Sequence, residues 1–256
     1  MHPRLLTRLA AVTAAAAATV GLVACGGSAR PQTQPVEVSP AETTASNGAP
    51  PEATDPPAAT GVEVARPTGP VEVFASPAGP STLTLPPTTS FGSARALVVT
   101  GRADGWLNVL LPTRPNGSTG WIRADGVPVR TVTAEVRVDL SERSLQVLEA
   151  GTPVLQSAVA VGTAAAPTPL GRFFVVDKVD TGSSASAYGP FALGLSGHSD
   201  VLDQFGGGDG QIAIHGTNAP ASIGTAASHG CLRVPNDVVT RLADLLPLGT
   251  PVLVVE

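Results

Sequence analysis

The sequence predicts a mainly β protein, made of a small β-barrel followed by a β-sandwich with one helix near its C-terminal end. Short apolar runs alternate with turn signals from about residue 62 onward, which is typical of all-β domains. Only one segment, beginning near Asn236, has apolar residues at helical spacing. Of the 256 residues, 43% are hydrophobic, which is enough for packed cores.

Residues 1–24 have the layout of a secretory signal, in which Arg4 and Arg8 precede an apolar, alanine-rich stretch. That stretch is shorter than the roughly 20 residues needed to span a bilayer. It ends in Leu22–Gly26 (LVACG), which resembles the lipobox of bacterial lipoproteins, where the cysteine is lipidated and becomes the new N-terminus. We therefore expect Cys25 to anchor the protein at the outer face of the cytoplasmic membrane. An ordinary cleaved signal with an incidental cysteine is the alternative.

Residues 25–61 are predicted to form a disordered tether. The segment is rich in Pro, Thr, Ala, Ser and Glu and has no aromatic residue, so it cannot bury enough apolar surface to fold. A flexible coil of this length reaches roughly 30 Å, and a proline-extended one up to about 100 Å. Such a tether would allow the folded part to reach the cell wall.

Residues 62–131 are predicted to form the small β domain, with turns at Asp104-Gly105 and Asn116-Gly117. The expected strands are 71–74, 96–99, 106–110 and 120–122. The segment resembles bacterial Src-homology-3-like domains in Gly105–Val109 (GWLNV) and Gly120–Ile122 (GWI), the two runs that hold both tryptophans. A module that binds the cell wall and a spacer packed on its neighbour remain alternative interpretations.

Residues 132–256 are predicted to begin with a hairpin, in which strands at 135–140 and 145–148 flank a turn. Further strands are expected at 154–161, 173–176, 192–195, 211–214 and 251–255. The helix has Asn236 as its expected N-cap and Pro247 as its stop signal. The stretch from Asp180 to Gly210 is rich in Gly, Ser and Asp and is long enough to form a mobile lid.

Charge and cysteine content narrow the possible functions. The formal net charge of -5 gives no basic patch to neutralise a phosphate backbone, so nucleic acid is not an expected partner. The sequence has two cysteines, Cys25 and Cys231. If Cys25 is acylated, the mature chain cannot form an internal disulfide, and Cys231 is a free thiol in an oxidising compartment. An inert buried cysteine is the alternative to a reactive one.

The histidines favour a reactive cysteine, because the three beyond the signal lie between His198 and His229, close to Cys231 in sequence. A free thiol has a pKa of about 8.5 and needs a base or a positive field to become a nucleophile at neutral pH. His215 ends the expected strand 211–214 and can approach from another strand, so we interpret it as the base. His229 is tied to the same loop as Cys231, so we expect it to support that loop.

Two further features of this region matter for its chemistry. Gly230 permits a tight turn between His229 and Cys231, so the amides of Gly230 and Cys231 are candidate oxyanion donors. A zinc site is an alternative reading, because three histidines and a cysteine are zinc-ligand types. They lack the short paired spacing of such sites, and we expect no metal or other cofactor.

The motifs His215-Gly216-Thr217 and Ser228–Val234 (SHGCLRV) resemble the signature of the L,D-transpeptidase catalytic domain over roughly residues 133–255. The resemblance implies that the cysteine attacks the L-to-D peptide bond of a peptidoglycan stem tetrapeptide and releases D-alanine. A second stem amine then resolves the thioester to give a 3→3 cross-link. Hydrolysis of the thioester would make the protein a carboxypeptidase instead. A non-enzymatic lipoprotein that binds the wall is the third possibility, and acylation of Cys231 by a carbapenem would argue against it.

Carried over by position, the resemblance makes Cys231 the nucleophile and His215 the base. The amides of His229, Gly230 and Cys231 would line the oxyanion site, next to Ser228. Some family members have a serine after the first histidine that orients the imidazole. This chain has Gly216 there, so a backbone carbonyl would have to orient the ring.

The remaining candidate residues have less defined roles. Arg233 would either pair with a substrate carboxylate or brace the loop. Tyr188, in the expected lid, would cover the substrate. Thr217 and Asn218 are candidate substrate contacts or structural polar residues, and His198 is expected to be structural. The sequence gives no prediction of the oligomeric state.

Overall fold

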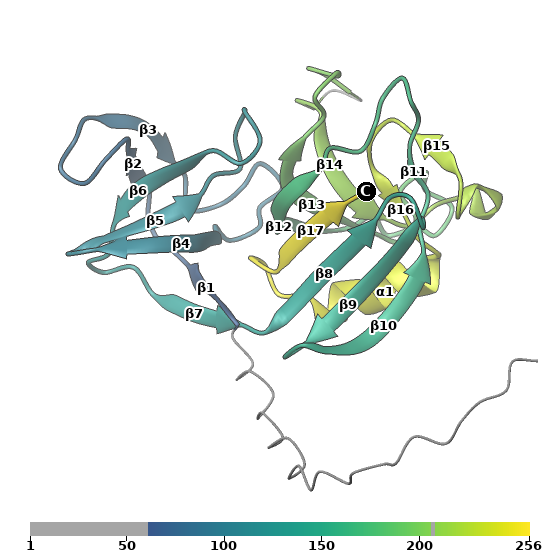
Figure 1. Ribbon diagram of the computed structural model, residues 1–256, viewed down its shortest axis with the longest axis horizontal. Coiled ribbons are helices and arrows are strands. Elements are labelled where there is room, and N and C mark those ends of the chain that lie inside the picture. The colour runs from purple at the N-terminus through teal and green to yellow at the C-terminus, as the bar shows by residue number, and fades with distance from the viewer. Residues whose placement is uncertain (1–60, 206–207) are drawn as a thin grey trace, which may run out of the picture. The chain divides into compact units, whose positions relative to one another are not determined.

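The computed structural model describes residues 61–205 and 208–256 (Figure 1). The expected signal, the lipidation site at Cys25 and the tether as far as residue 60 lie outside the described residues. Residues from 61 onward belong to one compact unit. Within this described part, no helix is both long and apolar enough to cross a membrane. The expected mainly β fold is confirmed, with a single α-helix among the described residues.

The first half of the described chain forms a seven-stranded antiparallel sheet in the order β3-β2-β6-β5-β4-β1-β7 (Figure 1). Its strands are β1 (Val62–Ala65), β2 (Val71–Phe74), β3 (Ser81–Leu85), β4 (Leu97–Ala103), β5 (Trp106–Leu110), β6 (Thr119–Arg123) and β7 (Val129–Val132). The four strands expected here are present, and β1, β3 and β7 were not expected. The likeness to Src-homology-3-like domains stays a prediction.

Strand β5 supplies much of the core of this first sheet, because its side chains alternate between the two faces. Leu107 and Val109 are fully buried, and Ile122 of β6 is fully buried beside them. On the other face, the Trp106 ring meets Phe74 edge-on at a centroid distance of 5.1 Å. The Trp106 of the first Gly-Trp motif is therefore explained by packing within this sheet.

The second half forms an eight-stranded sheet in the order β10-β9-β8-β17-β12-β13-β14-β16 and a small two-stranded sheet of β11 and β15. The large sheet contains β8 (Ala134–Asp139), β9 (Ser144–Glu149), β10 (Thr152–Ala158), β12 (Gly171–Asp180), β13 (Phe191–His198), β14 (Gln211–His215), β16 (Leu232–Arg233) and β17 (Pro251–Val255). The small sheet pairs β11 (Val161–Gly162) with β15 (Ala226–Ser228), and a short 3-10 helix, η1 (Pro220–Ser222), precedes β15. The predicted hairpin is β8–β9.

The helix α1 (Asn236–Leu245) lies where the sequence predicts it, but Asn236 is not its N-cap. Pro235 occupies the cap position, and the helix has no side-chain cap. Asn236 is the first helical residue, and its side-chain oxygen accepts the Thr217 amide instead, at 2.7 Å. The helix buries Val239 and Leu242 against the sheet, which explains its apolar spacing.

The expected lid between Asp180 and Gly210 is not one loop. Strand β13 runs through the middle of it and pairs with β12 and β14. Two shorter loops remain, one at residues 181–190 and one whose described parts are residues 199–205 and 208–210, which we call the first and second site loops. The glycine and serine content that suggested a single lid reflects these two turns at opposite ends of a buried strand.

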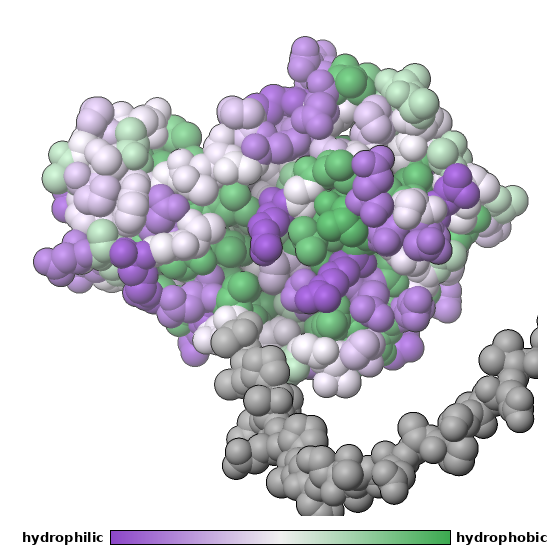
Figure 2. All heavy atoms as spheres, in the orientation of Figure 1, coloured by the Kyte–Doolittle hydropathy of each residue, from purple (hydrophilic) through white to green (hydrophobic). Residues whose placement is uncertain are grey.

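The surface in the orientation of Figure 1 is mixed in polarity. Hydrophobic patches on this face are separated by hydrophilic ones (Figure 2). The described part of the chain has eight large hydrophobic side chains that are exposed. Five of them are aliphatic, and the three aromatic ones, Phe91, Tyr188 and Phe205, share one location that is described below.

Candidate active site

The fold brings Cys231, which directly precedes β16, next to β14, the strand that ends at His215. Strands β14 and β16 run parallel, with His215 opposite Arg233. The same register places Cys231 opposite Ala213, two residues before His215 on β14. Residues two apart in a strand share a face, and adjacent strands lie about 4.8 Å apart, so the Cα atoms of Cys231 and His215 are roughly 8 Å apart. The two side chains therefore start from the same side of the sheet edge.

The Cys231 thiol is largely buried beside β14. Burial raises the pKa of the thiol, and this effect exceeds the lowering by a hydrogen bond from the Ala213 amide and by the positive charge of Arg233. Cys231 is a free cysteine and lines a cavity. The resting sulfur is therefore a neutral thiol that is accessible from that cavity.

The His215 ring is buried and held in one orientation. Its Nδ1 lies 2.6 Å from the carbonyl oxygen of Gly216, so Nδ1 carries the proton and donates it there. The expectation that a backbone carbonyl orients this imidazole is confirmed. The pKa of His215 is lowered to about 4, mainly by burial and to a lesser extent by the charge of Arg233, while the hydrogen bond to the Gly216 carbonyl opposes this effect. At neutral pH the ring is uncharged, and its Nε2 has a lone pair that can accept a proton.

Close packing explains why glycine stands at position 216. A Cβ atom there would lie 2.3 Å from the Asn236 side-chain oxygen and 3.0 Å from the Cα atom of Gly189. A serine, as in some family members, does not fit beside Asn236. The first site loop passes close to the His215-Gly216 segment, so the imidazole partner at this position is the backbone carbonyl of Gly216 and not a side chain.

The loop before Cys231 is fixed by two hydroxyl groups. The Ser228 hydroxyl donates to the Cys231 carbonyl at 2.6 Å and accepts the Gly230 amide at 3.1 Å. The buried Thr168 hydroxyl donates to the Gly230 carbonyl at 2.9 Å. Gly230 has a φ of 114°, which favours glycine. Ser228 supports the loop as expected, but the Gly230 amide already has a partner, which leaves the amides of His229 and Cys231 as candidate oxyanion donors.

The other predicted residues lie around this pair. The Tyr188 ring, in the first site loop, is 4.8 Å from the His215 ring. Thr217 is buried and accepts the Ala219 amide, whereas exposed Asn218 donates to the Ala185 carbonyl of the first site loop. Thr217 and Asn218 thus stabilise the neighbouring loops through these hydrogen bonds. The Nε atom of Arg233 is buried without a hydrogen-bond partner among the described residues.

His198 and His229 make their contacts with residues other than Cys231 and His215. Buried His198 contacts Asp209 through Nε2 at 3.1 Å, and exposed His229 stacks on Phe205 of the second site loop at 5.0 Å between ring centroids. Within residues 61–205 and 208–256, no three His, Cys, Asp or Glu side chains are grouped closely enough to hold a metal ion. The three histidines and the cysteine that suggested a zinc site have different partners.

A cavity of about 640 Å³ opens beside the Cys231 sulfur. Its wall includes residues of β12, β13 and β14 together with Tyr188 from the first site loop and Phe205 from the second. Ser90 and Phe91, which precede β4, complete it. The cavity is large enough for part of a peptide, and Cys231 lies on its wall.

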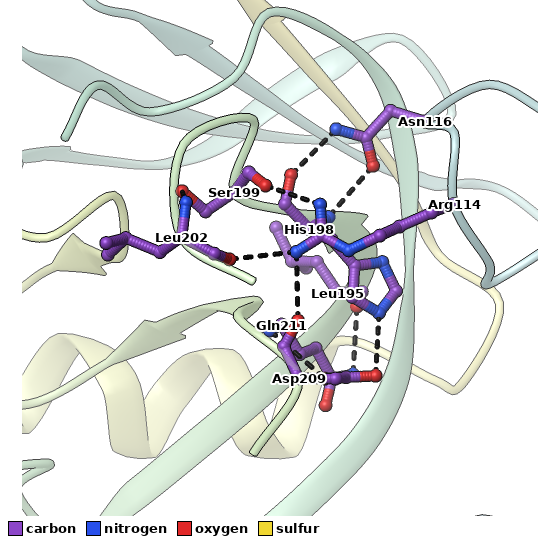
Figure 3. A network of polar contacts seen from close by, with 8 residues as sticks. All are labelled: Arg114, Asn116, Leu195, His198, Ser199, Leu202, Asp209 and Gln211. Carbon is purple, nitrogen blue, oxygen red and sulfur yellow. Dashed lines mark hydrogen bonds and ion pairs between the residues drawn. The ribbon is translucent and has the colours of Figure 1, made fainter. Parts of the chain in front are cut away.

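The second site loop is held by two residues that precede β6, as Figure 3 shows. The Arg114 guanidinium donates to the carbonyls of Ser199, Leu202 and Asp209 at 2.6, 2.9 and 2.9 Å. The Asn116 side chain bonds both the amide and the carbonyl of His198 at 2.9 and 2.7 Å. A β-hairpin turn was all that the sequence indicated for these residues, because no local pattern shows which distant carbonyls a side chain will reach.

Comparison with known proteins agrees with this geometry. Residues 133–254 match the family model of the YkuD L,D-transpeptidase catalytic domain. The candidate L,D-transpeptidase YkuD of Bacillus subtilis is 30% identical over 124 residues, which cover 48% of this chain and 67% of that protein. The chain belongs to the L,D-transpeptidase family. The candidate L,D-transpeptidase YkuD of Bacillus licheniformis is 34% identical over 122 residues, or 48% of this chain and 66% of that protein.

The match to this L,D-transpeptidase family covers the second sheet and its loops. The chain spans about two thirds of the length of these two curated relatives. An L,D-transpeptidase from Xylanimonas cellulosilytica with a solved structure is 27% identical over 48% of this chain and 60% of that one, with a TM-score of 0.36. The seven-stranded sheet over residues 62–132 lies outside the matched family model.

Sequence reasoning missed several residues that build the site. Thr168 gave no signal, because a single threonine between Pro167 and Pro169 has no distinctive pattern. Ala213 contributes only its amide, which every residue has. Phe205 and Phe91 are isolated aromatic residues in polar loops, and an isolated aromatic residue is a weak sign of binding.

Proposed function

We propose that this protein is a cysteine acyltransferase that acts on peptidoglycan stem tetrapeptides, as an L,D-transpeptidase that makes 3→3 cross-links. One observation supports the proposal most directly. A buried thiol at a cavity wall shares a sheet face with an uncharged imidazole whose Nδ1 is fixed by Gly216, so that only Nε2 can accept a proton. Nucleophilic catalysis by a cysteine needs such a base within hydrogen-bond reach of the sulfur, and we propose that the two side chains meet in the acylation step.

The first half of the reaction forms the thioester. His215 Nε2 takes the proton of the Cys231 thiol while the sulfur attacks the carbonyl of the L-to-D peptide bond. Because the thiol pKa is raised and the imidazole pKa is about 4, this proton transfer is unfavourable in the resting site and must occur together with the attack. The imidazolium then gives its proton to the amine of D-alanine as the C–N bond breaks.

The negative charge that develops on the carbonyl oxygen needs donors. The amides of His229 and Cys231 are the proposed donors, because Ser228 already accepts the Gly230 amide. Arg233, whose charge reaches both Cys231 and His215, adds a positive field at the same place. We propose that its positive charge, more than loop bracing, is its main contribution.

The second half of the reaction transfers the acyl group. The amine of a second stem attacks the thioester, His215 Nε2 accepts a proton from that amine, and the imidazolium returns it to the departing sulfur of Cys231. Water in place of the amine would give a tripeptide, which is the carboxypeptidase alternative. Neither route needs a cofactor, since the energy of the cleaved peptide bond is kept in the thioester.

We also propose that the protein is exported and lipidated at Cys25, and that the segment up to residue 61 tethers it to the membrane. The support is the sequence alone: the signal-like layout of residues 1–24 and the lipobox-like run Leu22–Gly26. Growth with a labelled fatty acid tests this, because label should enter the normal chain and not a Cys25→Ser chain. Label in that variant would refute lipidation at Cys25.

Incubation with a disaccharide tetrapeptide and mass spectrometry of the products tests the proposed reaction. A cross-linked dimer and free D-alanine are the expected products of the full chain, and the Cys231→Ser chain should give neither. A disaccharide tripeptide without dimer would assign the carboxypeptidase reaction. The absence of any product from the normal chain would refute both reactions.

A further inference from the structure

Exposed aromatic side chains gather at one place on the described part of the molecule. Phe91, Phe205 and Tyr188 are 62%, 45% and 40% exposed, and they are the only exposed aromatic side chains among the large hydrophobic residues of residues 61–205 and 208–256. All three line the cavity that contains Cys231. Large aromatic surfaces left open to water are costly unless they meet a ligand, so the cluster indicates a binding surface.

Phe91 differs from the other two because it does not belong to the matched catalytic domain. It lies in the segment between β3 and β4 of the first sheet, at the tip of a tight turn over Thr89–Ser93. The Thr89 amide donates to the Ser93 carbonyl at 2.9 Å, and the Gly92 amide donates to the Thr89 carbonyl at 3.0 Å. Gly92 has a φ of 82°, a conformation that favours glycine.

The base of this turn is built from buried polar contacts. The Arg95 guanidinium, only 7% exposed, donates to the carbonyls of Pro86 and Thr88 at 3.0 and 3.2 Å. Burial lowers the pKa of Arg95, and the charge of Asp177 opposes that effect. The turn is therefore an ordered element, and its tip has a defined position.

Two contacts attach the turn to the wall of the cavity. The Thr89 hydroxyl donates to Asp177 of β12, and the Ser93 hydroxyl accepts the Lys178 amide of β12 at 3.3 Å. Asp177 itself lines the cavity. Because Thr89 and Ser93 flank Phe91, both sides of the turn are fixed to β12 while its tip stays open to solvent.

We propose that Phe91 is a specificity-determining residue of the acyl-donor site, and that the seven-stranded sheet completes that site by presenting it. The aromatic ring provides an apolar contact for carbon surface of the bound stem peptide, in the same cavity as the nucleophile. This inference rests on the proposed function for the identity of the substrate. It assigns residues 62–132 a direct part in substrate binding, in place of a spacer role.

Steady-state kinetics with the disaccharide tetrapeptide tests the inference, using full chains that also contain Cys25→Ser so that Cys231 is the one thiol. Phe91→Ala should raise KM about three- to tenfold, the effect expected for loss of one aromatic contact, with kcat changed by less than about twofold. Phe91→Tyr should keep the normal KM, because it retains the ring. Alkylation of Cys231 by iodoacetamide and the thermal midpoint should not change in either variant.

Val154→Ala is the matched control, since Val154 is an exposed apolar residue of β10 outside the cavity. It should leave KM unchanged. A normal KM in Phe91→Ala, or a lower thermal midpoint with a fall in kcat, would overturn the inference while leaving the proposed function intact. If the chain with normal Phe91 forms no product, the proposed function fails, and this inference fails with it.

Discussion

His215 determines how the reaction should depend on pH. Its ring is buried, which lowers its pKa to about 4, and it can act as a base only when it is uncharged. The acid limb of the rate of Cys231 acylation should therefore lie near pH 4. The measurement is the initial rate of acylation by the tetrapeptide between pH 3.5 and pH 8, with return to pH 7 as a control for unfolding. An acid limb near 6.5 would mean that the imidazole is solvated in the working enzyme.

Gly216 is a second position where a single added side-chain atom should change stability and turnover. Gly216→Ser places a Cβ atom 2.3 Å from the Asn236 side-chain oxygen, so the His215 segment or helix α1 must shift. The free energy of unfolding should fall by about 1–3 kcal/mol, and turnover should fall with it. Urea unfolding measures the change. Gly69→Ser is the control, because no atom lies within 4 Å of a Cβ there, and an undisturbed Gly216→Ser would show that the packing is looser than described.

At the residue scale, reactive residues of rare types could be identified from the sequence. Supporting residues of common types could not. Cys231 and His215 could be paired because a lone mature cysteine close to clustered histidines is unusual. The role of the Gly216 carbonyl followed from the missing serine. Two hydrogen bonds could not be predicted, because each joins segments that meet only in the folded chain. They are the bond from the Thr168 hydroxyl to the Gly230 carbonyl and the bond from the Thr217 amide to the Asn236 side chain.

The second site loop shows how one element depends on another. Arg114 donates to three carbonyls of this loop, and Phe205 and Asp209 of the loop line the cavity. Arg114→Gln removes most of these bonds, so amides of residues 199–210 should exchange with deuterium about tenfold faster or more. Acylation of Cys231 should slow as well.

Hydrogen–deuterium exchange with mass spectrometry measures the faster amide exchange expected in the second site loop of Arg114→Gln. Arg130→Gln is the matched control, because Arg130 is an exposed arginine of β7 in the same sheet. It should leave exchange in the second site loop unchanged. Equal exchange in the normal and Arg114→Gln chains would show that the loop is ordered by its own contacts, such as that between the Ser199 amide and the Gly210 carbonyl.

Several strands with a clear apolar pattern were predictable, and several short ones were not. The hairpin β8–β9 follows the period-2 pattern of its apolar residues, and the closing strand β17 is a continuous apolar run. The strand β16 has two residues and no pattern, although it places Cys231 opposite Ala213. The expected N-cap at Asn236 was wrong because Pro235 took that position and the side chain found a tertiary partner.

The whole molecule should lose stability in mild acid because of one buried ring. The pKa of His215 is about 4 in the folded protein and 6.5 for an exposed histidine, so the unfolded chain binds a proton more readily between these values. Stability from this group is complete above pH 6.5 and declines as the pH falls to about 4, by on the order of 3 kcal/mol.

Urea unfolding at pH 7 and pH 4 measures this loss, and His215→Gln isolates it because glutamine does not titrate. The normal chain should lose more stability than the variant between these two pH values. Equal losses would show that other groups account for the acid sensitivity and that the His215 ring is not protected from water.

At the scale of the whole molecule, the order of two β segments could be predicted from the sequence. The hydrogen bonds between the two segments could not be predicted, because Thr89, Arg114 and Asn116 contact residues more than 80 positions away in the sequence. Periodicity and turn chemistry describe neighbours in sequence. A cavity wall shared by two sheets depends on long-range contacts that leave no local pattern.

The central claim is that the Cys231 sulfur captures an acyl group with His215 as its base. Intact-mass spectrometry of the Cys25→Ser chain after exposure to the tetrapeptide tests it most directly. We predict a covalent adduct of a disaccharide tripeptide on the peptide that contains Cys231, no adduct in Cys231→Ser, and an adduct formed at least about 100-fold more slowly in His215→Ala. An adduct retained by Cys231→Ser, or formed at the normal rate in His215→Ala, would contradict it.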